Sequence, residues 1–244
     1  MPESLPPIAH LDRTLPTVEA NLALDEALLI ESEANGGAVL RTWELPHLAV
    51  VMGATCRFRD EVNVERCRLD GVPIARRTSG GGTVLIGPGA LNFAVILPRG
   101  ASKELESVEG AQRFVMERTA RAIRGRGIAV ELAGSGDWVV GDRKVSGSAQ
   151  RRLKSHLMVH ATILDAFPLG LIGQYLGTPR RQPAYRAGRP HGDFVANLGM
   201  GRSALRQAIR SAWPGPDRPV EVPEGTIRAL IDERLGNQAW IERF

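Results

Sequence analysis

The chain has 244 residues and a mass of 26.4 kDa, a size that suits one large domain or one domain with a small appendage. Hydrophobic residues make up 43% and charged residues 24%, which is ordinary for a globular protein and excludes an intrinsically disordered one. The net charge of +4 fits an acidic partner, but no run of Lys and Arg interleaved with aromatic residues supports nucleic-acid binding.

The N-terminal half predicts two helices and several short strands. Leucines and alanines recur at the helical period between acidic residues from Thr17 to Glu33, which predicts a long helix. A shorter helix over residues 62–71 ends at Gly71. Apolar runs bounded by Pro or Gly predict strands over residues 38–45, 47–53, 72–79 and 90–98.

The C-terminal half predicts one helix, a series of strands and two further helices. The helix covers Val108 to Gly125. Strands follow over 127–134 and 137–165, with tight turns at Gly141-Asp142 and around Ser155. The segment from Pro179 to Pro190, rich in Arg, Pro and Gly, predicts a long surface loop, and helices are expected over Ser203–Trp213 and Pro223–Leu235. Strands outnumber helices and several are adjacent in sequence, so we expect an α+β fold with a mixed, largely antiparallel sheet flanked by helices.

The stretch "RRTSGGGTV" places two arginines before three consecutive glycines at a strand end. It is neither the GxGxxG nor the GxxxxGK[ST] nucleotide motif. Because adjacent strand residues point to opposite faces, one of Arg76 and Arg77 should line the glycine surface while the other faces away. Bare backbone beside a guanidinium favours an anionic ligand, and the alternative is a turn whose glycines serve geometry alone.

A second motif, "GDRKVSGSAQ", follows about sixty residues later. Lys144 is one of only three lysines, and beside small residues it could hold a phosphate or carboxylate as a point charge. A solvated lysine on a hairpin is the alternative. His160 lies within an apolar strand, where a histidine is more often a satisfied core residue. No nucleophile elbow or carboxylate pair supports hydrolase chemistry.

Cysteine content and the N-terminal sequence bear on location. Cys56 and Cys67 form no CxxC pair and have no His at metal-ligand spacing, so we expect no metal site in the protein. The N-terminus lacks the pattern of a signal peptide, and no apolar run approaches the ~18 residues of a membrane helix. We therefore expect a cytoplasmic protein that does not bind membranes.

The two motifs together resemble the catalytic domain of lipoate-protein ligases, in the superfamily shared with biotin-protein ligases and octanoyltransferases. "ARRTSGGGTV", "GDRKVSGSAQ" and "HATIL" occur in the family's order. "NLALDEALL" is similar to its first helix, "LRTWELPHLAVVMG" to its first strand pair, and "ALNFAVIL" to the strand after the glycine loop. The resemblance covers roughly residues 17 to 200 and implies the biotin/lipoate-protein ligase fold.

The resemblance also implies an activity. Family members use ATP and Mg²⁺ to activate lipoate or octanoate as an acyl-adenylate, and they pass the acyl group to a lysine of a carrier domain. It implies a catalytic role for Lys144, which would contact the activated carboxylate and the α-phosphate, and a position near the adenosine for Asp137. The remaining residues that we expect to bind substrate or adenylate are Arg76, Arg77, Ser79, Gly80, Gly81, Gly82, Ser146, Gly147 and His160.

The chain departs from the family pattern at two positions. Ligases commonly carry a histidine where this chain has Ile86, and an asparagine where it has Gly136. We expect a single catalytic domain over 1–244, with a core over about 17–200, a helical extension over about 201–244 and no separate C-terminal accessory domain. Either a separate small protein completes the enzyme, or the chain is a transferase that takes a pre-activated acyl group. A non-catalytic homologue that binds the acyl group or its carrier is the third interpretation.

The expected partner is a lipoyl-accepting carrier domain of the 2-oxoacid dehydrogenase E2 type or the glycine cleavage H protein type. Such carriers are generally acidic, whereas this chain places four arginines in its Pro-rich loop. We expect these arginines to form a docking rim for the carrier. They are Arg180, Arg181, Arg186 and Arg189. A solvated loop is the alternative.

Overall fold

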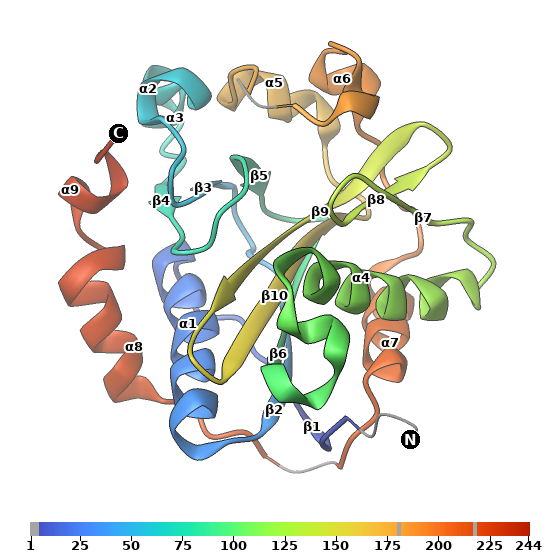
Figure 1. Ribbon diagram of the computed structural model, residues 1–244. Helices are drawn as coiled ribbons and strands as arrows, with labels where there is room; N and C mark the ends of the chain where they lie inside the picture. Colours follow the sequence, from blue (N-terminus) through green and yellow to red (C-terminus); the bar gives the residue numbers. More distant parts are fainter. Residues whose placement is uncertain (1–4, 180–181, 217–218) are drawn as a thin grey trace.

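The computed structural model describes residues 5–179, 182–216 and 219–244, and a seven-stranded sheet forms its centre (Figure 1). The order of strands across this sheet is β1-β2-β6-β10-β9-β8-β7. Their bounds are Ile8–Asp12 for β1, Ala38–Trp43 for β2, Ala90–Pro98 for β6, His156–Leu164 for β10, Arg143–Arg152 for β9, Asp137–Val140 for β8 and Glu131–Ala133 for β7. The last four of these in sequence, β7 to β10, form a meander.

Pairing in this sheet is antiparallel except between β1 and β2. β6 and β10 pair along their whole length, from His156 opposite Pro98 to Leu164 opposite Ala90. The expected mixed, largely antiparallel sheet is confirmed. The parallel edge strand β1 was not predicted, because "IAHLD" has only five residues and no strict alternation of apolar and polar side chains.

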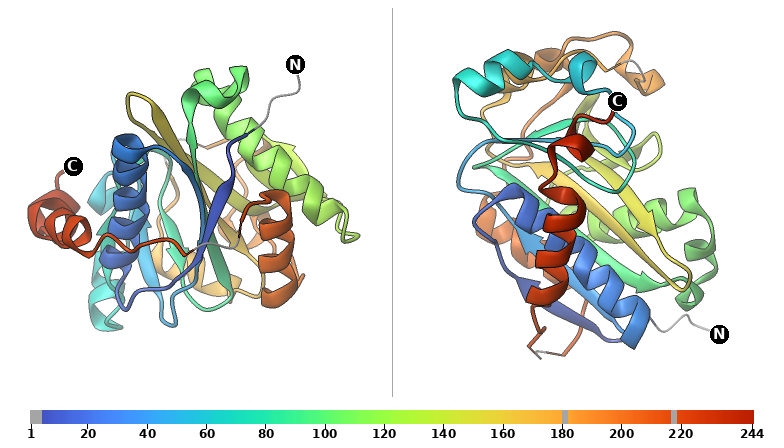
Figure 2. Two further views of the ribbon diagram at one scale, coloured as in Figure 1. Left: turned by 90° about the horizontal axis from the view of Figure 1, so that it is seen from below. Right: turned by 90° about the vertical axis from the view of Figure 1, so that its left-hand side faces the viewer.

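Helices cover both faces of the sheet (Figures 1 and 2). One face carries α4 (Val108–Arg124) and α7 (Arg202–Ala212). The other face carries α1 (Val18–Asn35), and α8 (Glu224–Leu230) packs against the outer side of α1 (Figure 2). Buried side chains of β6 alternate between the two layers. Phe93 and Val95 pack toward α4 and α7, whereas Ala94 and Ile96 pack toward α1.

The long helices begin and end close to where the sequence predicts. Thr17 caps α1, accepting a hydrogen bond from the Ala20 amide, and Ser107 caps α4 in the same way through the Gly110 amide. Gly125 follows the last residue of α4. The predicted helix over Pro223–Leu235 is α8 continued by the π-helical segment η5 (Ile231–Leu235).

A small second sheet carries the glycine triplet. Its central strand is β3 (Ala49–Met52), which pairs in parallel with β4 (Ile74–Arg76) and antiparallel with β5 (Val84–Ile86). The glycines join β4 to β5 across this strand. β2 and β3, on either side of Pro46, belong to different sheets.

Short helices surround the small sheet and the upper end of the molecule in Figure 1. They are α2 (Phe58–Glu61), α3 (Val64–Leu69), α5 (Ile172–Tyr175), α6 (His191–Phe194) and α9 (Gln238–Ile241). The 3-10 turns are η1 (Arg99–Ala101), η2 (Lys103–Glu106), η3 (Leu169–Leu171) and η4 (Ala184–Arg186). None of the helices in the described part of the chain is long and apolar enough to cross a membrane.

Candidate active site

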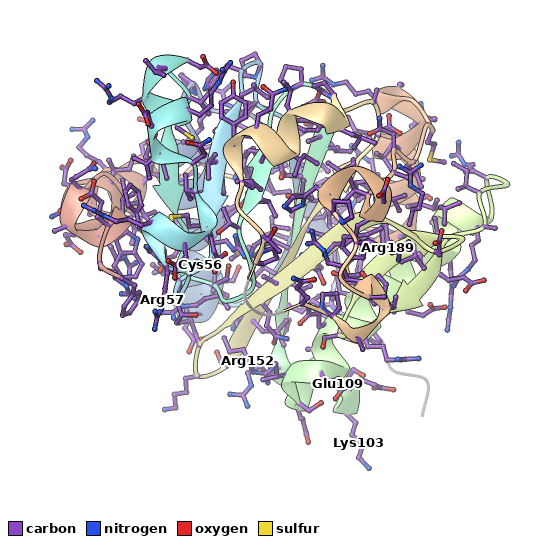
Figure 3. The ribbon with its side chains drawn as sticks, turned by 90° about the horizontal axis from the view of Figure 1, so that it is seen from above. Cys56, Arg57, Lys103, Glu109, Arg152 and Arg189 are labelled. Atoms are coloured by element: carbon purple, nitrogen blue, oxygen red, sulfur yellow. The ribbon has the colours of Figure 1, made fainter. Side chains whose placement is uncertain are left out.

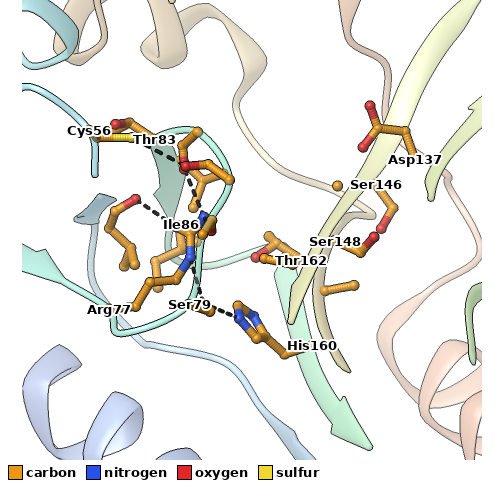
Figure 4. Close-up of a pocket in the computed structure, with 18 of the residues that line it drawn as sticks. Cys56, Arg77, Ser79, Thr83, Ile86, Asp137, Ser146, Ser148, His160 and Thr162 are labelled. Atoms are coloured by element: carbon orange, nitrogen blue, oxygen red, sulfur yellow. Dashed lines mark hydrogen bonds between the residues drawn. The ribbon is translucent and has the colours of Figure 1, made fainter. Parts of the chain in front are cut away.

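A cavity of about 1050 Å³ lies between the glycine loop of the small sheet and the strands β8, β9 and β10. Figure 4 shows its two walls. Arg77, Ser79, Thr83 and Cys56 lie on one side, and Asp137, Ser146 and Ser148 lie on the other. The two walls therefore come from segments that are far apart in the sequence.

Arg77 organises the glycine loop from inside. Its Nη2 atom donates to the carbonyl oxygens of Gly80 (2.7 Å) and Gly82 (2.9 Å), and its Nε atom donates to Ser79 Oγ at 3.1 Å. A Cβ atom at Gly81 would lie 2.9 Å from Arg77 Nη2, and Gly81 has a φ of +86°. Glycine is required there both for the left-handed conformation and for the close approach of the guanidinium. Burial lowers the pKa of Arg77 to about 10, so it stays cationic at neutral pH.

His160, on β10, joins the loop through the Ser79 hydroxyl. The distance from Ser79 Oγ to His160 Nε2 is 2.6 Å. Ser79 Oγ accepts from Arg77 Nε and keeps one proton and one further lone pair for the hydrogen bond with His160 Nε2. Burial, together with the charge of Arg77, lowers the pKa of His160 to about 3. The imidazole ring is therefore uncharged at neutral pH and forms part of the cavity wall.

Lys144 and Asp137 form an ion pair on the opposite wall. Lys144 Nζ lies 2.9 Å from Asp137 Oδ2, and the same oxygen accepts a 2.6 Å hydrogen bond from Tyr185. The side chains of Lys144 and Asp137 are 26% and 17% exposed, so both reach the cavity without being free in solvent. The carboxylate holds the ammonium in place, while Tyr185 holds the carboxylate.

A β-bulge directs Lys144 over Gly147. Trp138 pairs with Ser146 while its neighbour Val139 pairs with Lys144, so Val145 is the extra residue of β9. One extra residue reverses the alternation of side chains and brings positions 144 and 147 to the same face. A Cβ atom at Gly147 would lie 2.9 Å from Lys144 Nζ. Bare backbone at Gly147 therefore provides the space that the lysine side chain occupies.

The two serines of β9 differ in their surroundings. Ser148 Oγ donates to the Gly136 carbonyl at 2.7 Å and accepts from Gln112 Nε2 at 2.7 Å. Ser146 Oγ is buried and has no hydrogen-bond partner among the described residues, although it borders the cavity. Gly136 itself has a φ of +135°, and a Cβ atom there would lie 2.8 Å from Ser148 Oγ. An asparagine side chain does not fit at this position in the present packing.

Arg76, which we expected to bind substrate, lies outside the cavity lining. Its Nη1 atom donates to the carbonyls of Gly53 (3.0 Å) and Cys56 (2.7 Å), and its Nε and Nη2 atoms donate to the Ile241 carbonyl. The alternation of side chains along the strand turns it away from Arg77. It fastens the C-terminal segment to the small sheet, so the structure gives Arg76 a structural role and does not bring it to the cavity where we expected it.

The structure does not place Arg186 in the docking rim that the sequence predicts. Arg186 is only 3% exposed and lines the cavity, so it cannot be a solvated rim charge. Arg189 makes a 2.7 Å ion pair with Asp142. Figure 3 shows Cys56 and Arg189 on opposite sides of β9 and β10. Arg180 and Arg181 lie outside the described residues.

Cys56 also lines the cavity, a position that the sequence did not predict. Its Sγ atom donates to the Gly81 carbonyl at 3.3 Å, and beside it Thr83 donates to Glu61 at 2.8 Å. Burial raises the pKa of the Cys56 thiol, which keeps it protonated. No local motif marks Cys56, because the glycine loop and the segment after β3 meet only through the small sheet.

The rest of the cavity lining is largely apolar, which suits a hydrocarbon chain. The apolar side chains are Leu22, Trp43, Val51, Leu85, Ile86, Phe93, Leu164, Ile172, Leu176 and Phe194. Among the residues that the structure describes, no group of three or more His, Cys, Asp or Glu side chains could hold a metal ion. The site thus combines an apolar cavity with cations on both polar walls.

Comparison with known proteins gives a family match over most of the chain. Residues 17–202 match the family described as the lipoyl protein ligase A/B catalytic domain. One relative is a lipoate-protein ligase A of Aeropyrum pernix, by the name given to it. It is 38% identical to this chain over 144 residues, which cover 59% of this chain and 52% of that protein. The chain spans about half the length of the curated relatives that it matches first.

Two solved structures share the fold along nearly the whole chain. One, described as a lipoate-protein ligase A bound with ATP, has a TM-score of 0.82 at 21% identity and covers 98% of this chain and 99% of the other. The second comes from a bi-partite lipoate protein ligase and its E2 lipoyl domain from Thermoplasma acidophilum. Its TM-score is 0.83 at 21% identity, with 98% and 96% of the chains covered. At this identity the likeness shows a common fold.

Proposed function

The chain belongs to the lipoyl protein ligase A/B catalytic domain family, and we propose that it activates lipoate or octanoate with ATP and transfers the acyl group to a carrier lysine. In the first step a carboxylate oxygen attacks the α-phosphorus of ATP, which forms the acyl-adenylate and releases pyrophosphate. In the second step the ε-amine of the carrier lysine attacks the acyl carbonyl, and AMP leaves. The proposed enzyme is therefore an ATP-dependent ligase.

The observation that carries this proposal is one cavity with an apolar lining and cations on two walls. Adenylation joins two anions, so positive charge must offset their repulsion and stabilise charge that grows on the α-phosphate. Lys144 supplies a partly exposed ammonium, held by Asp137 at 2.9 Å. Arg77 supplies a second positive charge behind the glycine loop. A site for an uncharged ligand would need neither cation.

The other site residues take supporting roles in this proposal. The bare backbone of Gly80, Gly81 and Gly82 would let the carboxyl end of the acyl chain lie against the loop. Asp137 would lie near the adenosine, and the buried hydroxyl of Ser146 would bind the adenylate. Neutral His160 would keep Ser79 oriented. Gly147 would contribute by leaving room for Lys144.

We expect Mg²⁺ to enter with ATP. Magnesium in nucleotide sites is commonly held by substrate phosphates and water with one or two carboxylates, so no large acidic cluster is needed. Such a cluster is absent from the described residues. Asp137, already paired with Lys144, is the carboxylate on the polar wall. Magnesium would then be brought by the nucleotide.

The proposed partner is a lipoyl carrier domain of the E2 or H-protein type. The Thermoplasma acidophilum structure pairs a bi-partite ligase with its E2 lipoyl domain, which supports a carrier of this class. It also supports a separate accessory subunit for the present chain. We propose one catalytic domain over 1–244, since α7 joins the core on one face of the sheet and α8 packs against α1, which covers the other face.

The alternative is a transferase that takes the acyl group from a pre-activated donor through a cysteine thioester. Cys56 favours it, because the thiol borders the cavity beside Gly81. Its raised pKa disfavours it, because the thiolate is the nucleophile. The ligase interpretation therefore leads.

A set of parallel incubations distinguishes these three functions. The chain is mixed with a lipoyl carrier domain and octanoate, with and without ATP and Mg²⁺, or with octanoyl-carrier protein and no ATP. An increase in carrier mass that requires ATP supports the ligase. Transfer without ATP, with an octanoyl group trapped on Cys56, would establish the transferase. Modification in neither mixture, with accessory protein added, would favour the non-catalytic homologue.

A further inference from the structure

Arg186 is a buried cation on the polar wall of the cavity with an unused hydrogen-bond donor. It lies in η4, between α5 and α6, and its residue is 3% exposed. Its Nη2 atom is buried and has no hydrogen-bond partner in the described part of the chain. Arg186 is nevertheless among the residues that line the cavity. An unsatisfied buried donor is costly unless a ligand supplies the acceptor.

The surroundings of Arg186 position the guanidinium and leave its charge uncompensated. Nε donates to the Arg189 carbonyl at 2.9 Å, and the guanidinium lies 4.8 Å from the centre of the Phe194 ring. Among the described residues no carboxylate forms an ion pair with it, since the nearby acid Asp142 pairs with Arg189. A charge that is buried, oriented and unpaired is an anion receptor.

Arg186 and Lys144 line the same cavity, and the segment that carries Arg186 packs on the Lys144–Asp137 pair. The neighbouring Tyr185 donates to Asp137 Oδ2, the oxygen that Lys144 Nζ contacts. Ser146 Oγ, the other unpartnered buried polar atom of this wall, lies two residues from Lys144. The wall thus offers an ammonium, a guanidinium and a hydroxyl to the cavity.

Charge decides which anion this wall suits. Asp137 already offsets much of the Lys144 charge, so Lys144 alone does not neutralise a triphosphate. A guanidinium matches phosphate oxygens geometrically, and it remains charged at any working pH. We infer that Arg186, with Lys144 and Ser146, forms a phosphate subsite for the nucleotide. This inference rests on the proposed function, which requires ATP in the cavity.

Calorimetric titration of the full chain tests the subsite. ATP, inorganic pyrophosphate and octanoate are titrated separately into wild type, Arg186→Met, Arg186→Lys and the control Arg143→Met. Arg143 is an exposed residue of the β8–β9 hairpin, next to Lys144. It donates a hydrogen bond to the Gly192 carbonyl and does not line the cavity. We expect Arg186→Met to weaken ATP and pyrophosphate binding by about tenfold or more, the size of one charged hydrogen bond. Arg186→Lys should recover part of the loss, and octanoate binding should change by less than about twofold.

The outcomes distinguish the subsite from the proposed function. If wild type binds ATP and pyrophosphate and Arg186→Met binds both equally well, the subsite is wrong and the function stands. If wild type binds pyrophosphate but not ATP, with the loss in Arg186→Met, Arg186 binds a phosphate anion that is not a nucleotide, and the nucleotide subsite and the ligase function both fall. If wild type binds neither, both fall. If Arg186→Met unfolds, the test rests on Arg186→Lys and on a Ser146→Ala variant. The subsite is wrong if both variants unfold thermally like wild type and bind ATP with wild-type affinity.

Discussion

Lys144 Nζ lies 2.9 Å from Asp137 Oδ2, across the open backbone of Gly147. The β-bulge at Val145 creates this arrangement by bringing positions 144 and 147 to one face. The same carboxylate oxygen is held by Tyr185, so the pair is fixed from a third segment of the chain. A cation oriented in this way is suited to a developing negative charge, and it is already in position before substrate binds.

Replacing Lys144 by methionine should remove catalysis with little effect on folding. Asp137 would keep its hydrogen bond from Tyr185, and a partly exposed ion pair contributes at most about 1 kcal/mol to stability. Loss of one preorganised cation should cost about 2–4 kcal/mol of transition-state stabilisation in kcat/KM. Steady-state kinetics and urea unfolding measure the two effects. Lys144→Arg should recover little activity, because the planar guanidinium group does not place its charge where the compact ammonium group does. Wild-type turnover in Lys144→Met would end the proposed catalytic role.

Gly147→Ala should act through Lys144 alone. The new methyl group would meet Lys144 Nζ and Cε at 2.9 and 3.0 Å, and a lysine side chain can move away without disturbing the strand. Stability should be unchanged or slightly raised, because alanine costs less chain entropy than glycine. Activity should fall by roughly tenfold through misplacement of the ammonium.

Gly100→Ala is the matched control for this substitution. A Cβ atom at Gly100 meets nothing within 4 Å, and the residue lies in η1 rather than in the cavity lining. It should leave turnover and thermal unfolding as in wild type. Full activity in Gly147→Ala, alongside an inert control, would show that Lys144 has another productive position.

His160 should make stability depend on pH below neutrality. Its pKa is about 3 in the native protein and near 6.5 in the unfolded chain, so between these values the unfolded state binds a proton that the native state does not. The contribution of neutral His160 is fully present above pH 6.5 and decreases as the pH falls toward 3. Its slope is at most about 1.4 kcal/mol per pH unit.

Urea unfolding of wild type and His160→Gln between pH 7.5 and 4.5 isolates this contribution. The free energy of unfolding of wild type should decrease more steeply with falling pH than that of the variant. Other buried groups, such as His191, titrate in both proteins and cancel in the difference. Parallel curves would mean that the native cavity does not lower the pKa of His160 below its value in the unfolded chain.

Arg76→Met should be a stability variant and not a binding variant. Three carbonyl oxygens, of Gly53, Cys56 and Ile241, would lose their buried charged donor. We expect a loss of about 3 kcal/mol in the free energy of unfolding. Arg57→Met is the control, since Arg57 is 61% exposed and its contact with Asp60 is 3.9 Å long. Octanoate affinity should be retained at temperatures where the variant is folded. A stable Arg76→Met protein with lost affinity would restore the binding role.

The sequence predicted the main elements and the two motifs because their signals are local. Periodic leucines and the caps Thr17 and Ser107 define the long helices, and the turn at Gly141-Asp142 defines the β8–β9 hairpin. Alternation along a strand correctly separated the directions of the two adjacent arginines. It could not say which of them enters the cavity, because that depends on how the small sheet packs.

The parts that were missed depend on contacts between distant segments. Tyr185 lies 48 residues from the Asp137 that it holds, and Cys56 lies 25 residues from the Gly81 carbonyl. Arg186 looked like a surface charge because its loop is rich in Arg, Pro and Gly. Its burial follows from packing against Phe194, which composition does not reveal. Sequence reasoning therefore found the motifs and misjudged the loop beside them.

The proposed function requires one cavity to hold an acyl chain and a nucleotide that are joined through a carboxyl–phosphate link. The most direct measurement is calorimetric binding of an octanoyl-adenylate analogue in which a stable sulfamoyl group replaces the phosphate. It is compared with octanoate and AMP, in wild type and in Lys144→Met. Wild type should bind the analogue at least about a hundredfold tighter than either fragment, and Lys144→Met should lose most of this advantage. Affinity no higher than that of AMP or octanoate alone would contradict the proposed adenylate site.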